Sequence, residues 1–201
     1  MIQVDVEQMS IEWFALKAGV PSASNFDKIV TSKGEPSKQR DKYMHQLAGE
    51  RITKFREEGY QSEAMARGIA METEAVRLYE LITGLKADKV GVCYQNEEKA
   101  CLCSPDRLIL GDSVGVLEIK CPLLHTHVEY LLKNKLPTTY FQQVQGQIFI
   151  TGAEWCDFMS YYPGIKPLII RVERDPLFAV SLEKHLDVFC KELQGVVEKI
   201  R

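Results

Sequence analysis

Three short runs of strand-forming residues in the middle of the chain constrain its fold most. They are VGVCYQ (90–95), ACLCSPDRLIL (100–110) and GVLEIKCP (115–122), separated by polar segments that contain NEEK and GDS. Runs rich in Val, Ile, Leu and Tyr between such turn signals are typical of strands. Short connections of this kind join neighbouring antiparallel strands. The three runs therefore predict an antiparallel meander.

Charged residues on two of these runs are expected to meet. Because side chains alternate along a strand, Glu118 and Lys120 share one face while Ile119 points into the core. A turn near 111–113 would bring Asp106 close to Glu118. Neighbouring carboxylates repel each other unless a cation lies between them, and Mg²⁺ prefers oxygen ligands of this kind. Lys120 beside the metal would stabilise the developing charge, or orient and help deprotonate an attacking water, which completes a minimal set for metal-assisted phosphodiester hydrolysis. The alternative is a hairpin with solvated surface charges.

Segments with the apolar spacing of helices lie on both sides of these runs. Before the runs they cover 5–17, a stretch from Ser22 or Ser24 onward, 38–56 and about 61–82; after them they cover 125–133, 138–151 and about 176–200. Two further strand-like runs, WCDFMSYYP (155–163) and PLIIRVERD (167–175), lie between the last two helices. Helices that surround a sheet in this order predict an α/β or α+β domain. Because no repeat or low-complexity linker interrupts the chain, residues 1–201 are expected to form a single domain.

Composition and charge exclude several other classes of protein. No apolar run is long enough to cross a membrane, and residues 1–14 lack the basic and then apolar build of a signal peptide, so we expect a cytoplasmic protein. None of the six cysteines are spaced as CxxC, which favours buried or half-buried thiols over a zinc or iron–sulfur site. The net charge of −3 gives no overall basic field, so contact with nucleic acid needs a local patch or metal ions.

Pro105-Asp106 followed by Glu118-Ile119-Lys120 resembles the PD-(D/E)xK nuclease signature. The surrounding sequence is more specifically similar to the phage lambda exonuclease (YqaJ-type) family of viral recombination nucleases. Four blocks carry this similarity in the order of the family: LKAGVPSASNF, ARGIAMETEAVRLYELITG, ACLCSPDRLI with GVLEIKCP, and YFQQVQGQIFITG. The resemblance implies a restriction-endonuclease-like core, in which a central mixed sheet is flanked by helices.

The resemblance also implies which residues hold metal. Asp106, Glu118 and the backbone carbonyl of Ile119 match the metal ligands, and Lys120 matches the catalytic lysine. Glu72 matches a helical carboxylate that completes the metal site, although its position equally suits a solvated helix face. Two Mg²⁺ ions, with Mn²⁺ as an expected substitute, would activate the attacking water and stabilise the leaving 3′-oxygen.

Two glutamines and one methionine would border this site. Gln143 and Gln145 match a QxQ helix of the family, and Gln143 would touch a DNA phosphate or the attacking water. The alternative for this helix is a polar face without a part in the reaction. Met65, which precedes Glu72 on the same predicted helix, matches an apolar wedge that separates the terminal base pair. A place in the hydrophobic core is the alternative for Met65.

Three further residues match the family's pocket for a terminal 5′-phosphate. Ser24 and Ser104 match its hydroxyls, while Lys17 stands where the family has a phosphate-clamping arginine. A lysine pairs with phosphate as a point charge and lacks the bidentate fork of arginine. Ser24 also suits a plain helix N-cap. The resemblance thus implies a 5′-phosphate pocket that relies on a single point charge.

The activity that the resemblance implies is digestion of one strand of linear double-stranded DNA from its 5′ end. This leaves a 3′ single-stranded overhang for recombination by strand annealing. The family also implies a homotrimeric ring threaded by DNA, a single-strand annealing protein as partner, and a phage or prophage gene in a bacterial host. Two alternatives stay open. A PD-(D/E)xK endonuclease would cut closed circular DNA, and a non-catalytic DNA-end-binding module would release no nucleotide in the presence of metal.

Overall fold

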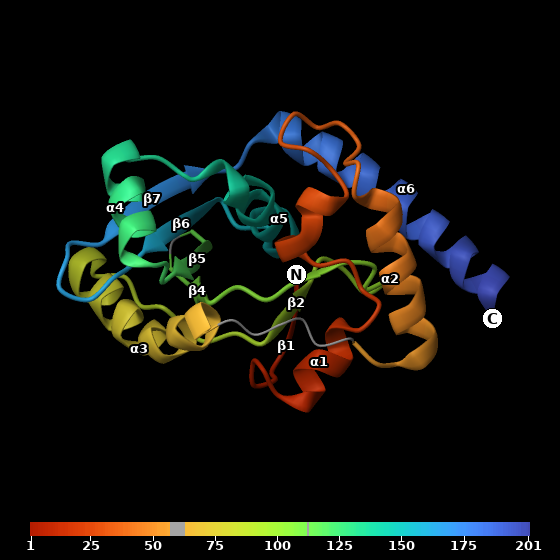
Figure 1. Cartoon of the computed structure of the whole chain (residues 1–201), viewed down its shortest axis with the longest axis horizontal. Coiled ribbons are helices and arrows are strands. Elements are labelled where there is room, and N and C mark those ends of the chain that lie inside the picture. The colour runs from red at the N-terminus through yellow and green to blue at the C-terminus, as the bar shows by residue number, and fades with distance from the viewer. Residues whose placement is uncertain (57–62, 112) are drawn as a thin grey trace.

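The computed structural model describes residues 1–56, 63–111 and 113–201, with the backbone alone for 63–67 and 69. Its helices are α1 (Ile11–Lys17), the 3₁₀ helix η1 (Ala23–Lys28), α2 (Arg40–Thr53), α3 (Glu63–Thr83), α4 (Leu124–Lys133), the 3₁₀ helix η2 (Thr138–Tyr140), α5 (Phe141–Thr151) and α6 (Pro176–Ile200). Its strands are β1 (Ile2–Val4), β2 (Val92–Tyr94), β3 (Leu102–Cys103), β4 (Arg107–Ile109), β5 (Gly115–Lys120), β6 (Trp155–Ser160) and β7 (Leu168–Glu173). Figure 1 shows α2 and α6 together at one end of the molecule, with α3 and α4 at the other. No helix among the described residues is long and apolar enough to cross a membrane.

The described strands form two sheets, with the orders β1-β2-β3 and β4-β5-β6-β7. In the larger sheet β5 runs parallel to β6, and antiparallel pairs lie on either side, so this sheet is mixed as expected. The predicted meander is wrong, because β2 and β3 belong to one sheet while β4 and β5 belong to the other. Pro105 lies at the break between β3 and β4. It has no N–H to donate, so it cannot continue a hydrogen-bonded ladder.

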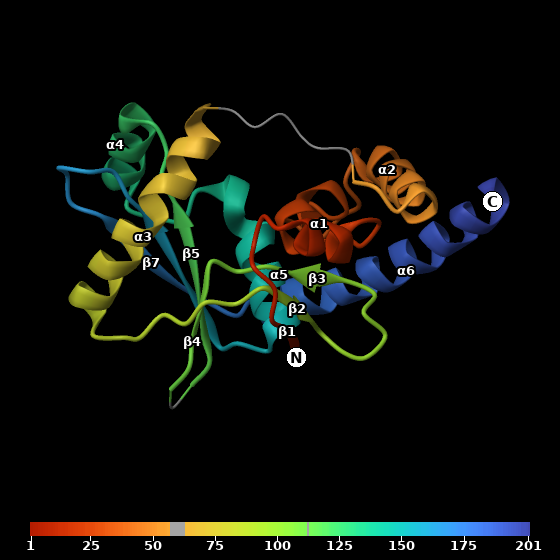
Figure 2. The ribbon, with the colours of Figure 1, turned by 90° about the horizontal axis from the view of Figure 1, so that it is seen from below.

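The two faces of the larger sheet are covered by different helices. Val116 of β5 packs in the cluster that contains Val144 of α5, whereas Leu117 packs in the cluster that contains Ala75 and Tyr79 of α3. Figure 2 shows α5 and α3 on opposite sides of β5. Alternation along β5 therefore directs every second side chain toward α5 and the others toward α3.

The N-terminal region differs most from the expected helices. The helix expected at 5–17 begins only at Ile11, where the hydroxyl of Ser10 accepts a hydrogen bond from the Trp13 N–H at 3.1 Å. The residues before it supply β1, which pairs with β2. The last helix was predicted correctly: Asp175 caps it by accepting from the Phe178 N–H at 2.9 Å.

A close approach between η1 and α5 positions the serines near the site. Gly146 of α5 faces η1, and a Cβ at this position would lie 2.5 Å from Cδ2 of Phe26. A side chain here would push η1 away from α5, so the glycine permits the contact. The helix expected from Ser22 onward is this short 3₁₀ turn, and the Ser22 side chain does not cap it. Its packing brings Ser24 to the edge of the cavity described next.

Candidate active site

The β4–β5 hairpin brings together the two carboxylates that the sequence predicts to meet. Arg107 pairs with Leu117 in the antiparallel register, which sets Asp106 opposite Glu118. The N–H of Ile119 donates to Oδ2 of Asp106 at 2.6 Å. The predicted position of the turn is confirmed, because the register closes at Ile109 and Gly115.

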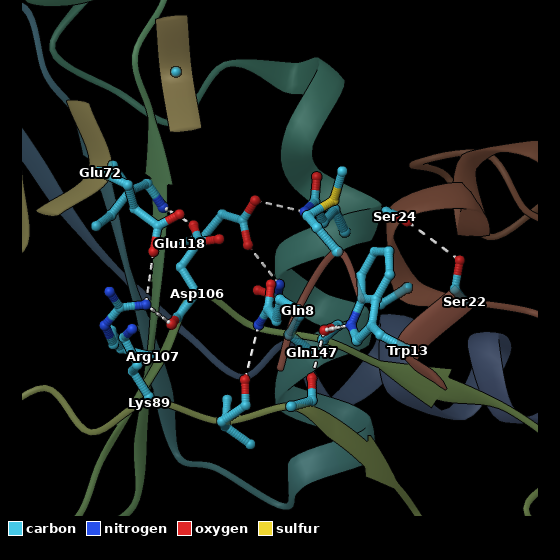
Figure 3. Close-up of a pocket in the computed structure, with 18 of the residues that line it drawn as sticks. Gln8, Trp13, Ser22, Ser24, Glu72, Lys89, Asp106, Arg107, Glu118 and Gln147 are labelled. Carbon is cyan, nitrogen blue, oxygen red and sulfur yellow. Dashed lines mark hydrogen bonds and ion pairs between the residues drawn. The ribbon is translucent and has the colours of Figure 1, made fainter. Parts of the chain in front are cut away.

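These carboxylates line a cavity of about 930 Å³. Residues of α1, η1, α3 and α5 also line it. Most of the residues that the sequence predicts for the site line this cavity, namely Lys17, Ser24, Glu72, Ser104, Asp106, Glu118, Ile119, Lys120 and Gln143. Figure 3 shows Glu72 and Arg107 on one side of this cavity, and Trp13, Ser22 and Ser24 on the other. The side chain of Met65 lies outside the described residues.

Glu118 is 2% exposed and both of its carboxylate oxygens accept hydrogen bonds. Gln143 donates to Oε1 and Gln147 donates to Oε2, each at 2.6 Å. The ammonium of Lys120 also donates to Oε1. Burial alone lowers the pKa of Lys120, but the carboxylates of Glu118 and Asp106 outweigh burial and raise this pKa above its ordinary value. Lys120 is therefore a fixed positive charge beside Glu118.

Asp106 has too little positive charge around it. Burial and the neighbouring Glu118 carboxylate raise the pKa of Asp106 well above its usual range, and Glu72 adds to this effect. Lys120 and the Ile119 N–H oppose the shift without cancelling it. A hard divalent cation between the carboxylates would favour the ionised form of Asp106. The carboxylate pair therefore fits an Mg²⁺ or Mn²⁺ ion in charge and in donor chemistry.

The third predicted carboxylate, Glu72, forms an ion pair with Arg107. Arg107 of β4 donates through Nη1 to Oε1 of Glu72 at 2.7 Å, and the same nitrogen donates to the carbonyl of Asp106. Within the residues that the structure describes, no three acidic, thiol or imidazole groups are gathered as a ready metal site. Glu72 is therefore paired with Arg107, although it lines the same cavity.

The opposite side of the cavity holds the residues predicted to bind phosphate. Lys17 is 7% exposed, and its Nζ lies 3.9 Å from the centre of the Trp13 ring. Burial, helped by the charge of Arg56, lowers the pKa of Lys17 to about 7. Ser104 accepts from Trp13 Nε1 at 2.8 Å and donates to the Gly91 carbonyl at 2.5 Å. The Ser104 hydroxyl therefore bonds two protein partners, one as acceptor and one as donor.

Gln145, which was predicted to border the site with Gln143, is not among the residues that line the cavity. It is 3% exposed, and it joins α5 to the segment after β7: Nε2 donates to the Glu173 carbonyl, and Oε1 accepts from the Asp175 N–H, both at 2.9 Å. Residues two apart on a helix point to different sides, whereas residues four apart share a face. The partner of Gln143 at the site is therefore Gln147, which the sequence analysis missed.

Three other residues that line the cavity were also missed. Gln8 donates through Nε2 to the carbonyls of Val90 and Pro105, both at 2.8 Å, and so fixes the segment that leads to Asp106. Tyr140 places its ring 5.3 Å from the ammonium of Lys120. Trp13 supports both Lys17 and Ser104. The helical spacing of Gln143 and Gln147 could have been read from the sequence, but the contacts of Gln8 join residues far apart in the chain.

Comparisons with known proteins agree with this site. The profile of the YqaJ-like viral recombinase domain matches residues 12–154. The crystal structure of an alkaline exonuclease (LHK-Exo) from Laribacter hongkongensis is 32% identical, with a TM-score of 0.85 over 95% of this chain and 96% of that chain. Its complex with dAMP matches equally well, with 32% identity, the same TM-score of 0.85 and the same coverage of 95% and 96%.

A phage related exonuclease from Haemophilus somnus 129PT shares the fold, with a TM-score of 0.71, 13% identity, and coverage of 90% of this chain and 96% of that chain. Curated protein sequences give no match. The family profile covers most of the chain, and the 32% identical relative covers nearly all of it. The chain belongs to the YqaJ-like viral recombinase family, and its core is of the PD-(D/E)xK type.

Proposed function

We propose that the protein is an Mg²⁺-dependent 5′-to-3′ exonuclease of linear double-stranded DNA, which leaves a 3′ overhang for strand annealing. The observation that carries the proposal is the cavity in which Asp106, Glu118 and Lys120 meet, where the charge of Lys120 only partly offsets that of the carboxylate pair. Membership in the family and the likeness to an alkaline exonuclease support a nuclease reaction at this cavity. A phage gene expressed in a bacterial cytoplasm is consistent with the family.

The metal would be held by Asp106, Glu118, the carbonyl of Ile119 and, after release from its present partner, Glu72. Bound Mg²⁺ supplies Lewis acidity, which favours an ionised water and stabilises charge on the leaving oxygen. Lys120, whose pKa the neighbouring carboxylates raise, would stabilise the charge that develops at the scissile phosphate, or orient and help deprotonate the attacking water.

Gln143 and Gln147 hold the Glu118 carboxylate from two directions, which fixes its orientation without adding charge. Because the amide groups come from one rigid helix, α5, the carboxylate has little freedom to turn. Gln143 also lines the cavity, where it would face a DNA phosphate or the attacking water.

The side of the cavity formed by Lys17, Ser24 and Ser104 is proposed to hold the terminal 5′-phosphate. A phosphate bound there, beside the carboxylate pair, would place the first phosphodiester bond of the same strand at the metal site. The complex of the related LHK-Exo with dAMP supports a cavity that accepts a deoxynucleoside monophosphate. We further propose Met65 as the wedge at the terminal base pair, a homotrimeric ring around DNA, and a single-strand annealing protein as partner.

End-labelled linear duplexes test the proposed function directly. With Mg²⁺, a 5′ label should be released early as mononucleotide while a 3′ label stays in long product, and chelation should stop both. Early release of the 3′ label would contradict the polarity. Cleavage of closed circular DNA would favour an endonuclease, and the absence of any metal-dependent nucleotide release would favour an end-binding module.

A further inference from the structure

The ion pair between Arg107 and Glu72 has no place in the proposed reaction, although both residues line the cavity. The side chain of Arg107 is 9% exposed and that of Glu72 is 31% exposed. An arginine stays charged under all ordinary conditions, and a second acceptor, the Asp106 carbonyl, holds the same nitrogen in place. The Arg107 guanidinium therefore places a fixed positive charge beside Glu72 and next to the Asp106–Glu118 pair.

We propose that Arg107 competes with the metal for Glu72 and so sets the cation concentration at which Glu72 joins the site. The inference rests on the proposed metal-dependent nuclease function and names a residue that tunes its metal affinity. The guanidinium and a divalent cation both need the Glu72 carboxylate, and each lowers the affinity of that carboxylate for the other. Full loading of the site must therefore break the contact between Nη1 and Oε1, now 2.7 Å long.

Removal of the guanidinium has a defined electrostatic consequence. Glu72, Asp106 and Glu118 would then face one cavity in which Lys120 is paired with Glu118 and the guanidinium no longer offsets the charge of Glu72. The free protein would lose stability, because Glu72 already repels the Asp106 carboxylate at its present position. A bound cation would relieve this repulsion, so binding would become tighter and would raise the melting temperature more.

Mn²⁺ titration of the full chain without DNA tests the proposal, by calorimetry and by the cation-induced shift in melting temperature. Arg107→Gln should lower the Kd for Mn²⁺ by about tenfold or more, since the competing charge-assisted hydrogen bond is lost. Its melting temperature without metal should fall, while the rise on adding Mn²⁺ should exceed that of the wild type. Arg107→Met, of similar length and without charge, should give the same result, and it replaces Arg107→Gln if that variant does not fold.

Two controls separate this effect from a general loss of stability. Arg171→Gln breaks another arginine–carboxylate pair, to Asp157 at 2.8 Å, whose residues do not line the cavity. This variant should lower the melting temperature and leave the Kd for Mn²⁺ unchanged. The double variant Glu72→Gln with Arg107→Gln should lose the gain in affinity, because the carboxylate that was set free is gone.

The outcomes distinguish the inference from the proposed function. Equal Kd values for the wild type and the folded Arg107 variants would overturn the inference and leave the proposed metal site standing. A gain in affinity that persists in the double variant would also overturn it, since the effect would not act through Glu72. If neither the wild type nor any variant binds Mn²⁺, both the inference and the metal-dependent function are overturned.

Discussion

Two buried carboxylates on neighbouring strands of the larger sheet have opposite surroundings. Asp157 of β6 is 2% exposed and accepts from Tyr79 at 2.7 Å and from two nitrogens of Arg171 at 2.9 and 2.8 Å. Glu118 of β5 is also 2% exposed, but it lines a large cavity together with a second carboxylate, Asp106.

The difference teaches how to separate a structural carboxylate from a chemical one. The charge of Asp157 is matched by a bidentate arginine, so nothing further is required there. On the cavity side the charge of the two carboxylates is only partly matched, and burial together with the Glu118 carboxylate raises the pKa of Asp106. Burial alone therefore does not mark the active site; a deficit of counter-charge in an accessible cavity does.

Loss of the cavity carboxylates should have the largest effect. Asp106→Asn or Glu118→Gln should lower the nuclease rate by at least about a thousandfold, since metal stabilisation of the transition state is worth several kcal/mol. Lys120→Ala should also stop cleavage while cation binding persists. The matched variant Asp157→Asn should keep the wild-type rate on a linear duplex. A near-normal rate in any of the three cavity variants would contradict the assignment.

The free energy of unfolding should respond in the opposite way, with a larger loss in Asp157→Asn than in Glu118→Gln. Asp157→Asn leaves the Arg171 guanidinium without its carboxylate and should lower the free energy of unfolding by about 3 kcal/mol. Glu118→Gln should cost clearly less, because it also removes the repulsion with Asp106. Chemical denaturation of both variants measures this, and an equal cost for the two would remove the contrast between the faces of the sheet.

Lys17 is a buried cation, and burial disfavours its charged form. A duplex with 5′-hydroxyl ends should start about tenfold more slowly than its 5′-phosphorylated twin. Because the pKa of Lys17 is about 7, the lysine is charged below this pH, and the preference should shrink as pH rises above it. Lys17→Arg should keep the preference at high pH. A ratio of initiation rates that is constant with pH would exclude Lys17 as the phosphate ligand.

The stability of the folded state should depend on Lys17 in a related way. The folded pKa of about 7 lies below the ordinary value of 10.5, so the unfolded chain binds more protons between these pH values. Stability should therefore rise with pH across this window, and Lys17→Met should flatten the rise. Melting curves between pH 7 and pH 10 provide the measurement, and an equal slope in both proteins would show that Lys17 is charged in the fold.

The smallest effects should separate Gln145 from Gln147, two of the glutamines of α5. Gln147→Met removes one hydrogen bond to Glu118 and should lower the rate by about fivefold with little loss of stability. Gln145→Met removes two backbone contacts near the start of α6, and should lower the free energy of unfolding by about 1–2 kcal/mol without changing the rate. Rate loss in Gln145→Met at full stability would restore Gln145 to the site.

Local patterns predicted those parts of the site that depend on neighbouring residues. The turn between β4 and β5 and the alternation of Glu118 and Lys120 follow from short-range rules, and the structure confirms both. The split into two sheets was missed, because one proline redirects a run that otherwise reads as a single strand. The roles of ligands and phosphate contacts stay predictions.

Contacts between distant segments could not be predicted from one sequence. The Glu72–Arg107 pair spans 35 residues, and Gln8 reaches Pro105 across 97 residues. Nothing in the local sequence of Arg107 says that α3 will pass beside it. The contacts of the QxQ motif follow helical geometry instead: Gln143 and Gln147 both reach Glu118, while Gln145 bonds the Glu173 carbonyl on another side of α5.

Mn²⁺ binding to the wild type, Asp106→Asn and Asp157→Asn tests the central contrast most directly. Titration calorimetry without DNA should give the same Kd for the wild type and Asp157→Asn. Binding should be lost in Asp106→Asn, because the cation is held by the Asp106 carboxylate, whose charge the protein only partly offsets. Undiminished binding by Asp106→Asn, or loss of binding in Asp157→Asn, would contradict the assignment of the metal site to the cavity carboxylates.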